Sequence, residues 1–362
     1  MPRNPITRRT FVQVGTAAAA SAMAGGLSAD QKKVPASSIL NYNPDMEYRP
    51  LGRSGIMVSA VALGGHWKRI DKIVPGVFKG RGWLSADLEN EGFKKNRAEV
   101  VGRCIERGIN WIDACTIQEV RAYSAALKGR RDKMYLACSW YQKEMRRKQY
   151  RTKKALLKTL DEGLRESGLE YADLWRITML SRSSRHTRAE VEEMIAALET
   201  AKKQGKIRLA GFSSHDRPHI KWMIETYPEV IDAICTPYTA KTKALPKDSL
   251  FDTLLKYKVG CFGIKPFSSN SLFKGDSTPD NPHAEEDNRI ARLTIRYILA
   301  NPAITAPIPG MITVQQVDNV AAAVKERRQL DEKEQAELKQ AADQMWAKLP
   351  PDYRWLRDWE YV

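Results

Sequence analysis

The run Gly108-Ile109-Asn110-Trp111-Ile112-Asp113 is a short, mostly apolar segment that ends in a carboxylate. We interpret its second half as a buried strand, because similar runs recur along the chain and amphipathic helical stretches separate them. Such alternation predicts parallel strands joined by helical crossovers. The eight predicted strands are Val58–Leu63, Asn110–Asp113, Met134–Cys138, Leu174–Thr178, Ile207–Phe212, Ala233–Pro237, Gly260–Ile264 and Thr305–Ile308.

One intervening helix is predicted over Arg188–Gln204, where apolar residues from Val191 to Leu198 share one face and Gly205 is a stop signal. Eight strand–helix units in about 300 residues fit an α/β fold of the (β/α)8 TIM barrel type in a single domain. A doubly wound sheet is the competing architecture. No Gly-x-Gly-x-x-Gly turn follows an early strand, which disfavours a dinucleotide-binding fold of that kind.

Composition is consistent with one large globular domain. The chain has 362 residues, 43% of them hydrophobic and 28% charged, and its formal net charge is +16. The positive charge favours anionic ligands or surfaces but does not define the fold. The five cysteines are an odd number without close metal-ligand spacing, so we expect buried free thiols and no metal site.

The start of the chain matches a twin-arginine export signal. Thr7-Arg8-Arg9-Thr10-Phe11-Val12 precedes an Ala/Gly-rich stretch over 14–26, which is too short and too weakly apolar for a good membrane span. Cleavage is expected after Ala24 or Ala29, and an uncleaved signal would tether the protein to the membrane. We therefore expect export of the folded protein by the twin-arginine machinery to a periplasmic or other extracytoplasmic location, with any cofactor loaded beforehand. A chance Arg-Arg pair in a disordered start is the alternative.

Four segments follow from these patterns: an export signal over 1–29, a linker over 30–45, the barrel over 46–345 and a Trp-rich tail over 346–362 that packs on the barrel. Two insertions, over 68–95 and 268–287, belong to strand-to-helix loops. Those loops form the barrel face where active sites lie, so either insertion is a lid or a flexible surface loop.

Several motifs together resemble the aldo-keto reductase family over roughly residues 46 to 342. They are Tyr48-Arg49-Pro50-Leu51-Gly52-Arg53-Ser54-Gly55, Leu63-Gly64-Gly65, Gly108 to Asp113, Ala126-Leu127-Lys128-Gly129-Arg130-Arg131, Gly205-Lys206-Ile207-Arg208, Gly211-Phe212-Ser213, Pro237-Tyr238, Asn301-Pro302 and Ile308-Pro309-Gly310-Met311. The resemblance implies a (β/α)8 barrel that uses a nicotinamide cofactor.

The resemblance also implies a catalytic set of Asp, Tyr, Lys and His, of which this chain keeps only Asp113. In the family, Tyr gives a proton to the substrate carbonyl, Lys lowers the Tyr pKa, Asp holds the Lys, and His orients the carbonyl. The matching positions here are Gln118 for Tyr, Ser139 for Lys and Thr178 for His. A shortened loop after Gln118 leaves a shift of one or two residues open, and Tyr123 lies too far into the next helix to substitute. Asp113 is then either unpaired or paired with a different cation.

The cofactor contacts that the resemblance implies are partly kept. Ser213 matches a carboxamide-binding residue, Ser214 stands for its Asn neighbour, Cys235 stands for a Gln, and Tyr238 matches the ring that stacks on nicotinamide. Ile312 stands where the family places a cation for the 2′-phosphate, so NADP or NAD is expected with weakened NADP selectivity. The expected cofactor-binding residues are Ser213, Ser214, Tyr238, Lys265, Pro309, Gly310, Met311 and Gln316.

Other polar residues follow predicted strands and are expected at the barrel mouth. His66 and His215 are candidate general acids or bases, or loop histidines without a role. Lys265 ends the seventh strand and is expected to face the pocket, contact a nucleotide phosphate, or lie in solvent. We expect Arg176 to point away from the barrel interior if Thr178 points inward.

A basic run over 143–158 follows the third strand and is either an attractor for an anionic substrate or a solvated helix face. The sequence thus supports an aldo-keto reductase-like oxidoreductase acting on a carbonyl or sugar-like, optionally anionic, small molecule, with His66 or His215 as substitute acid. A non-redox barrel that binds a sugar-like or anionic ligand is the alternative. A lyase or isomerase using Asp113 with His66 or Lys265 is a third hypothesis. Nucleic acid is not an expected partner.

Overall fold

The computed structural model describes residues 34–242, 249–278 and 280–357. The export signal predicted over 1–29 lies outside these residues. No helix among them is long and apolar enough to cross a membrane. Of the predicted linker, Asn41 and Asn43 are tied to the end of the first long helix, because their amides donate to the carbonyls of Ile105 and Glu106.

Eight parallel strands form the barrel, which confirms the predicted fold. Their order is sequential, and they are β3 (Leu63–Gly64), β4 (Trp111–Ala114), β5 (Tyr135–Cys138), β6 (Ala172–Thr178), β7 (Ile207–Ser213), β8 (Ala233–Pro237), β9 (Gly260–Ile264) and β10 (Ala306–Ile308). A parallel bridge between Gly64 and Gly310 joins the first strand to the chain after the last one. The amide of Gly64 donates to the carbonyl of Pro309 at 2.7 Å, so the sheet closes on itself.

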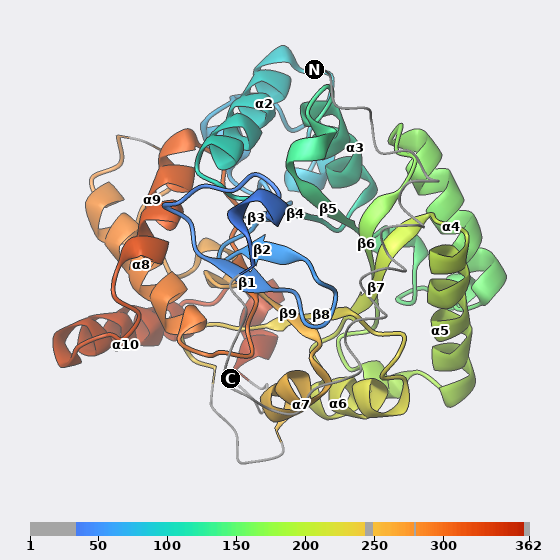
Figure 1. Ribbon diagram of the computed structural model, residues 1–362. Helices are drawn as coiled ribbons and strands as arrows, with labels where there is room; N and C mark the ends of the chain where they lie inside the picture. The colour runs from blue at the N-terminus through green and yellow to red at the C-terminus, as the bar shows by residue number, and fades with distance from the viewer. Residues whose placement is uncertain (1–33, 243–248, 279, 358–362) are drawn as a thin grey trace.

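Helices surround the barrel in a ring (Figure 1). They are α2 (Glu91–Glu106), α3 (Ile117–Ala126), α4 (Lys153–Glu166), α5 (Arg188–Lys203), α6 (Arg217–Thr226), α7 (Leu250–Tyr257), α8 (Ala284–Leu299), α9 (Val314–Lys325) and α10 (Glu332–Ala347). The helix predicted over 188–204 is α5, which begins at a capping box formed by Thr187 and Glu190. After α10 the chain forms a 3₁₀ turn over Pro351–Leu356.

The first predicted strand, Val58–Leu63, was wrong as a single element. The structure divides it between β2 (Met57–Ser59) and β3, and β2 pairs antiparallel with β1 (Tyr48–Pro50). The Ser59 hydroxyl donates to the carbonyl of Val61, which turns the chain between the two pieces. The β1–β2 hairpin lies across one opening of the barrel (Figure 1).

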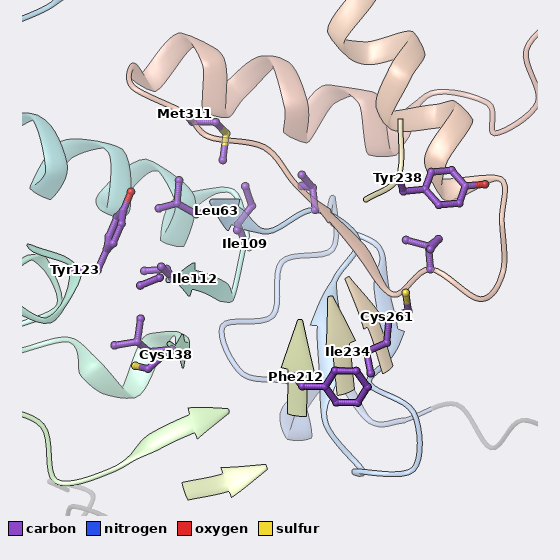
Figure 2. Packing of buried hydrophobic residues seen from close by; sticks show 14 of the residues in the cluster. Leu63, Ile109, Ile112, Tyr123, Cys138, Phe212, Ile234, Tyr238, Cys261 and Met311 are labelled. Atoms are coloured by element: carbon purple, nitrogen blue, oxygen red, sulfur yellow. The ribbon is translucent and has the colours of Figure 1, made fainter. Parts of the chain in front are cut away.

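Alternation along the strands divides the core in two. Trp111 on β4 points into the barrel and stacks on Phe262 of β9, with ring centroids 4.7 Å apart. The outward-facing residues pack under the helices: Figure 2 shows Phe212, Ile234 and Cys261 together, contributed by three adjacent strands. Asp113 lies two residues after Trp111 and therefore also faces inward, at the end of the barrel opposite the hairpin.

Candidate functional site

A cavity of about 510 Å³ opens at the carboxyl ends of the strands. Its volume lies within the range of small-molecule sites, and its position is the one where TIM barrels carry their active sites. The ends of β4, β6, β7 and β9 form its floor, while residues of both insertions and Tyr353 of the tail form its walls. Five predicted cofactor-binding residues besides Lys265 line it: Ser213, Pro309, Gly310, Met311 and Gln316.

At the floor, Asp113 forms a two-pronged ion pair with Arg176. The Nε of Arg176 lies 2.7 Å from Oδ1, its Nη2 lies 2.9 Å from Oδ2, and the two side chains are only 4% and 7% exposed. Burial works to lower the pKa of Arg176, but the Asp113 carboxylate more than offsets this and raises that pKa well above its ordinary value. Asp113 therefore has a permanent cationic partner.

The expectation that Arg176 points away from the interior was wrong. Residues two apart on a strand share a face, so Arg176 and Thr178 both point inward. The Arg176 guanidinium lies 3.4 Å from the Thr178 hydroxyl, and both residues line the cavity.

Ser139 lies beside this pair but behind the cavity wall. Its hydroxyl donates to the Glu144 carboxylate at 2.6 Å and lies 2.8 Å from the Thr178 hydroxyl. Glu144 is buried and also accepts from the indole of Trp175 and from two backbone amides. Burial raises the pKa of Glu144 although four donors face it. Ser139 thus fixes the wall and does not present a group to a ligand.

Gln118 does not line the cavity. It lies in the first turn of α3, where its side-chain oxygen accepts from Gln142. Cys115, just before that helix, lines the cavity instead and is half-buried, while the other four cysteines are buried free thiols as predicted. Tyr123 is fully buried, and its hydroxyl lies 3.3 Å from the carbonyl of Gly64.

His66 is held by Glu119, a residue that sequence reasoning missed. The imidazole Nδ1 lies 2.5 Å from Glu119 Oε1, and Glu119 Oε2 accepts from the backbone amide of Cys115. Glu119 is fully buried, whereas the His66 side chain is 40% exposed and lines the cavity. Since Nδ1 is committed to Glu119, Nε2 is the nitrogen left for a ligand.

The ligand atoms of His66, Cys115 and Glu119 lie within 4.8 Å of one another, so these side chains could hold a metal ion. Two features weigh against it. Both Glu119 oxygens already accept hydrogen bonds, and burial raises the Cys115 pKa well above its ordinary value, which disfavours the thiolate that a metal needs.

His215 is neutral in this site. Its ring stacks on Trp355 of the tail at 4.6 Å, and its Nε2 lies 3.4 Å from the ammonium of Lys265. Burial, followed by the charges of Lys265 and Arg146, lowers the pKa of His215 well below its ordinary value. A neutral imidazole beside an ammonium is an acceptor, so His215 is a poor proton donor.

Cations dominate the cavity wall. Lys68, Arg69, Arg146 and Lys265 line it, and none of the four forms an ion pair with Asp or Glu in the described part of the chain. Arg146 is the member of the basic run over 143–158 that reaches the cavity. The Lys68 ammonium donates to the Tyr353 hydroxyl at 3.0 Å and to the Ser269 hydroxyl at 2.5 Å.

From the floor the cavity continues as a groove to the start of α9. Thr313 caps this helix, and the Gln316 side chain accepts from the amide of Ile312. Two predicted cofactor contacts lie elsewhere. The Ser214 hydroxyl donates to the carbonyl of Ser181, and the Tyr238 ring packs on Phe251, so neither lines the groove.

Lys68 and Tyr353 were missed because they meet across 285 positions and no local pattern connects them. Glu119 had a local signal, since Thr116 and Glu119 have the spacing of a capping box. The Glu119 side chain instead reaches the amide before the cap and keeps its other oxygen for His66.

Two curated proteins resemble part of this sequence. The chain is 28% identical over 153 residues to L-glyceraldehyde 3-phosphate reductase of Escherichia coli (strain K12), covering 41% of this chain and 43% of that protein. It is 26% identical over 191 residues to L-galactose dehydrogenase of Arabidopsis thaliana, covering 48% and 59%. The chain thus matches less than two thirds of the length of either relative.

Solved structures show the same fold. An aldo-keto reductase from Bacillus halodurans in its holo form superposes with a TM-score of 0.58 at 21% identity, covering 85% of this chain and 99% of that one. An aldo/keto reductase from Brucella melitensis gives 0.55 at 14% identity, covering 82% and 99%. The model of the aldo/keto reductase family matches residues 82–343. The chain therefore belongs to the aldo/keto reductase family.

Proposed function

We propose that the protein is a nicotinamide-dependent oxidoreductase that acts on the carbonyl or hydroxyl group of a small, sugar-like molecule. The observation that carries this proposal is the continuous groove from the Asp113–Arg176 pair to the start of α9. Relatives named as a reductase and a dehydrogenase support the class of reaction.

The groove fits an elongated anionic cofactor. The groove reaches the start of α9, which is the positive end of a 12-residue helix and hence a common site for phosphate groups. Lys68 and Arg69 line the groove without a carboxylate partner in the described part of the chain. A bound nicotinamide dinucleotide would supply the hydride, and Ser213, Gly310 and Gln316, which line the groove, would hold it.

The chain's own groups would bind and orient the substrate. His66, with Nδ1 held by Glu119, presents Nε2 to a carbonyl or hydroxyl oxygen. The Asp113–Arg176 pair fixes the floor, and Lys265 and Arg146 favour a substrate that carries negative charge. Ile312 stands beside the groove where a cation would favour NADP, so we propose that NAD and NADP are discriminated weakly.

A non-redox barrel that binds an anionic or sugar-like ligand is the second candidate. It is favoured by the placement of Gln118 and Ser139, whose side chains are bonded to other protein groups outside the cavity. The two candidates differ in whether the groove holds a dinucleotide.

Nucleotide content separates them. The full chain would be purified from cytoplasm, denatured, and its supernatant assayed for NAD(H) and NADP(H), with thermal shifts on adding each cofactor to stripped protein. A blocking variant, Ala284→Trp, places an indole at the groove end of α8, and Ala300→Trp makes the same change at the exposed end of that helix. We expect nucleotide or a thermal shift with wild type and Ala300→Trp but not with Ala284→Trp. No nucleotide and no shift with wild type would overturn the oxidoreductase proposal.

A further inference from the structure

The Tyr353 hydroxyl lies at the cavity wall, where the ammonium of Lys68 bonds to it and the charge of Lys265 acts on it. Lys68 donates to it at 3.0 Å and also lies 4.6 Å from the ring centroid. Lys265, which directly follows β9, is a second cation whose charge acts on this hydroxyl. Tyr353 comes from the 3₁₀ turn after α10, so the C-terminal segment contributes directly to the cavity.

The two ammonium groups favour the ionised form of this phenol. Burial raises the pKa of Tyr353, but the charges of Lys265 and Lys68, together with hydrogen bonds to Lys68 and Ser269, outweigh burial and lower it below its ordinary value. Tyr141 lies on the same cavity wall, and there burial dominates and raises the pKa. Neither lysine forms an ion pair with Asp or Glu in the described ranges, and a phenolate at Tyr353 would give both of them a counter-charge.

We propose that Tyr353 is the proton donor to the substrate oxygen, with Lys68 and Lys265 stabilising the phenolate that remains; this rests on the proposed oxidoreductase function. With a bound nicotinamide as the source of hydride for the carbonyl carbon, the Tyr353 O–H bond would break as an O–H bond forms on the carbonyl oxygen of the substrate. The carbonyl is reduced to an alcohol and the cofactor is oxidised. Solvent then returns a proton to the phenolate.

The other acids of the wall serve less well. His215 is a neutral acceptor beside Lys265, and Tyr141 holds its proton more tightly than a free phenol. His66 is fixed at Nδ1 by Glu119, which suits a group that orients the substrate oxygen. Of these four groups, Tyr353 is the one that combines a lowered pKa with cations that stabilise its conjugate base.

The tail is anchored so that the hydroxyl keeps its position. Trp355 stacks on the His215 ring with an interplanar angle of 13°, and Leu356 is fully buried. The guanidinium of Arg357 donates to the carbonyls of Trp346 and Ala347, which ties the turn to the end of α10. Residues 346–357 therefore position a reactive group as well as covering apolar surface.

The test uses the full chain with Tyr353→Phe, Lys68→Met, and the control Tyr42→Phe at an exposed ring. Turnover is followed by NADPH fluorescence with 4-nitrobenzaldehyde as the carbonyl probe, and NADPH affinity by binding titration. We expect Tyr353→Phe to lower kcat by about 100- to 10,000-fold with NADPH affinity nearly unchanged. We expect Lys68→Met to move the alkaline limb of the kcat–pH profile upward, and Tyr42→Phe to match wild type.

A second measurement does not need turnover. Ultraviolet titration of wild type minus Tyr353→Phe isolates the ionisation of this phenol, and we expect it below the ordinary tyrosine range in wild type and higher in Lys68→Met. An ordinary or raised pKa, or wild-type turnover in Tyr353→Phe with NADPH bound, would overturn the proposal for Tyr353. Absence of both NADPH and NADH binding in wild type would instead overturn the proposed function.

Discussion

The Asp113–Arg176 pair gives the sharpest prediction for stability. Replacing one partner, as in Asp113→Leu or Arg176→Met, leaves the other charge buried with its side chain at most 7% exposed. Breaking a buried pair in this way costs about 3–5 kcal/mol, which is roughly a fifth or more of the 5–15 kcal/mol stability of a typical domain. We expect each single variant to unfold at a clearly lower urea concentration.

The double variant Asp113→Leu/Arg176→Met separates charge from packing. Replacing a whole buried pair with apolar side chains of similar volume is often nearly neutral, so the double variant is expected to be more stable than either single one. The assay is urea unfolding followed by tryptophan fluorescence, with slopes compared between variants. Glu99→Ala removes one side of the exposed Lys95–Glu99 pair and is expected to change stability by less than about 1 kcal/mol. The reasoning fails if either single variant loses no more free energy of unfolding than the Glu99→Ala control. It also fails if the loss in the double variant equals the sum of the losses in the two single variants.

Two further predictions concern buried groups outside the floor. Glu144 accepts four hydrogen bonds, and in Glu144→Gln the amide NH₂ would face N–H or O–H donors. We therefore expect the free energy of unfolding, measured in urea, to fall by about 2–4 kcal/mol. A change near zero would contradict this donor geometry. Burial lowers the pKa of His186 from 6.5 to about 4. Between pH 6.5 and pH 4 the unfolded chain therefore binds a proton at His186 and the folded chain does not. Stability is therefore expected to fall as pH falls from about 6.5 to 4, and the fall should be shallower in His186→Gln; an equal slope in both proteins would remove His186 as its source.

The sequence predicted the barrel because its signals are local. Gly108 and the apolar run after it define β4, and the predicted strand over 110–113 differs from Trp111–Ala114 by one residue. The alternation of side chains along a strand also predicts the orientation of Arg176, and our expectation for it misapplied that rule. Thr178 lies two positions later, so the two side chains must point to the same face. The split of Val58–Leu63 was less visible, because a serine hydroxyl bonded to the chain two residues on leaves no mark in hydropathy.

The site depends on long-range contacts, which a single sequence does not carry. Tyr353 could be assigned to an apolar tail from its tryptophan neighbours, but its position beside Lys68 requires the path of α10 and the turn after it. For Tyr238 the local sequence match was misleading. It matched a stacking position by its place after Pro237, yet its ring packs on Phe251 and its hydroxyl accepts from Asn301.

A closed barrel explains how this site keeps an ion pair at Asp113 without a cation at Ser139. Inward-facing residues of neighbouring strands point at the same space, so a long side chain from one strand can replace the cation of another. Arg176 on β6 reaches Asp113 on β4 across β5, and Ser139 is left to bond with Glu144. The same reasoning applies to the proton donor. The barrel determines where the donor is needed, and a phenol from any segment that crosses the barrel mouth can take that position. The tail crosses there, and the cations that would lower the Tyr353 pKa come from loops after β3 and β9, so the chemistry depends on the mouth as an assembled surface and not on one strand's sequence.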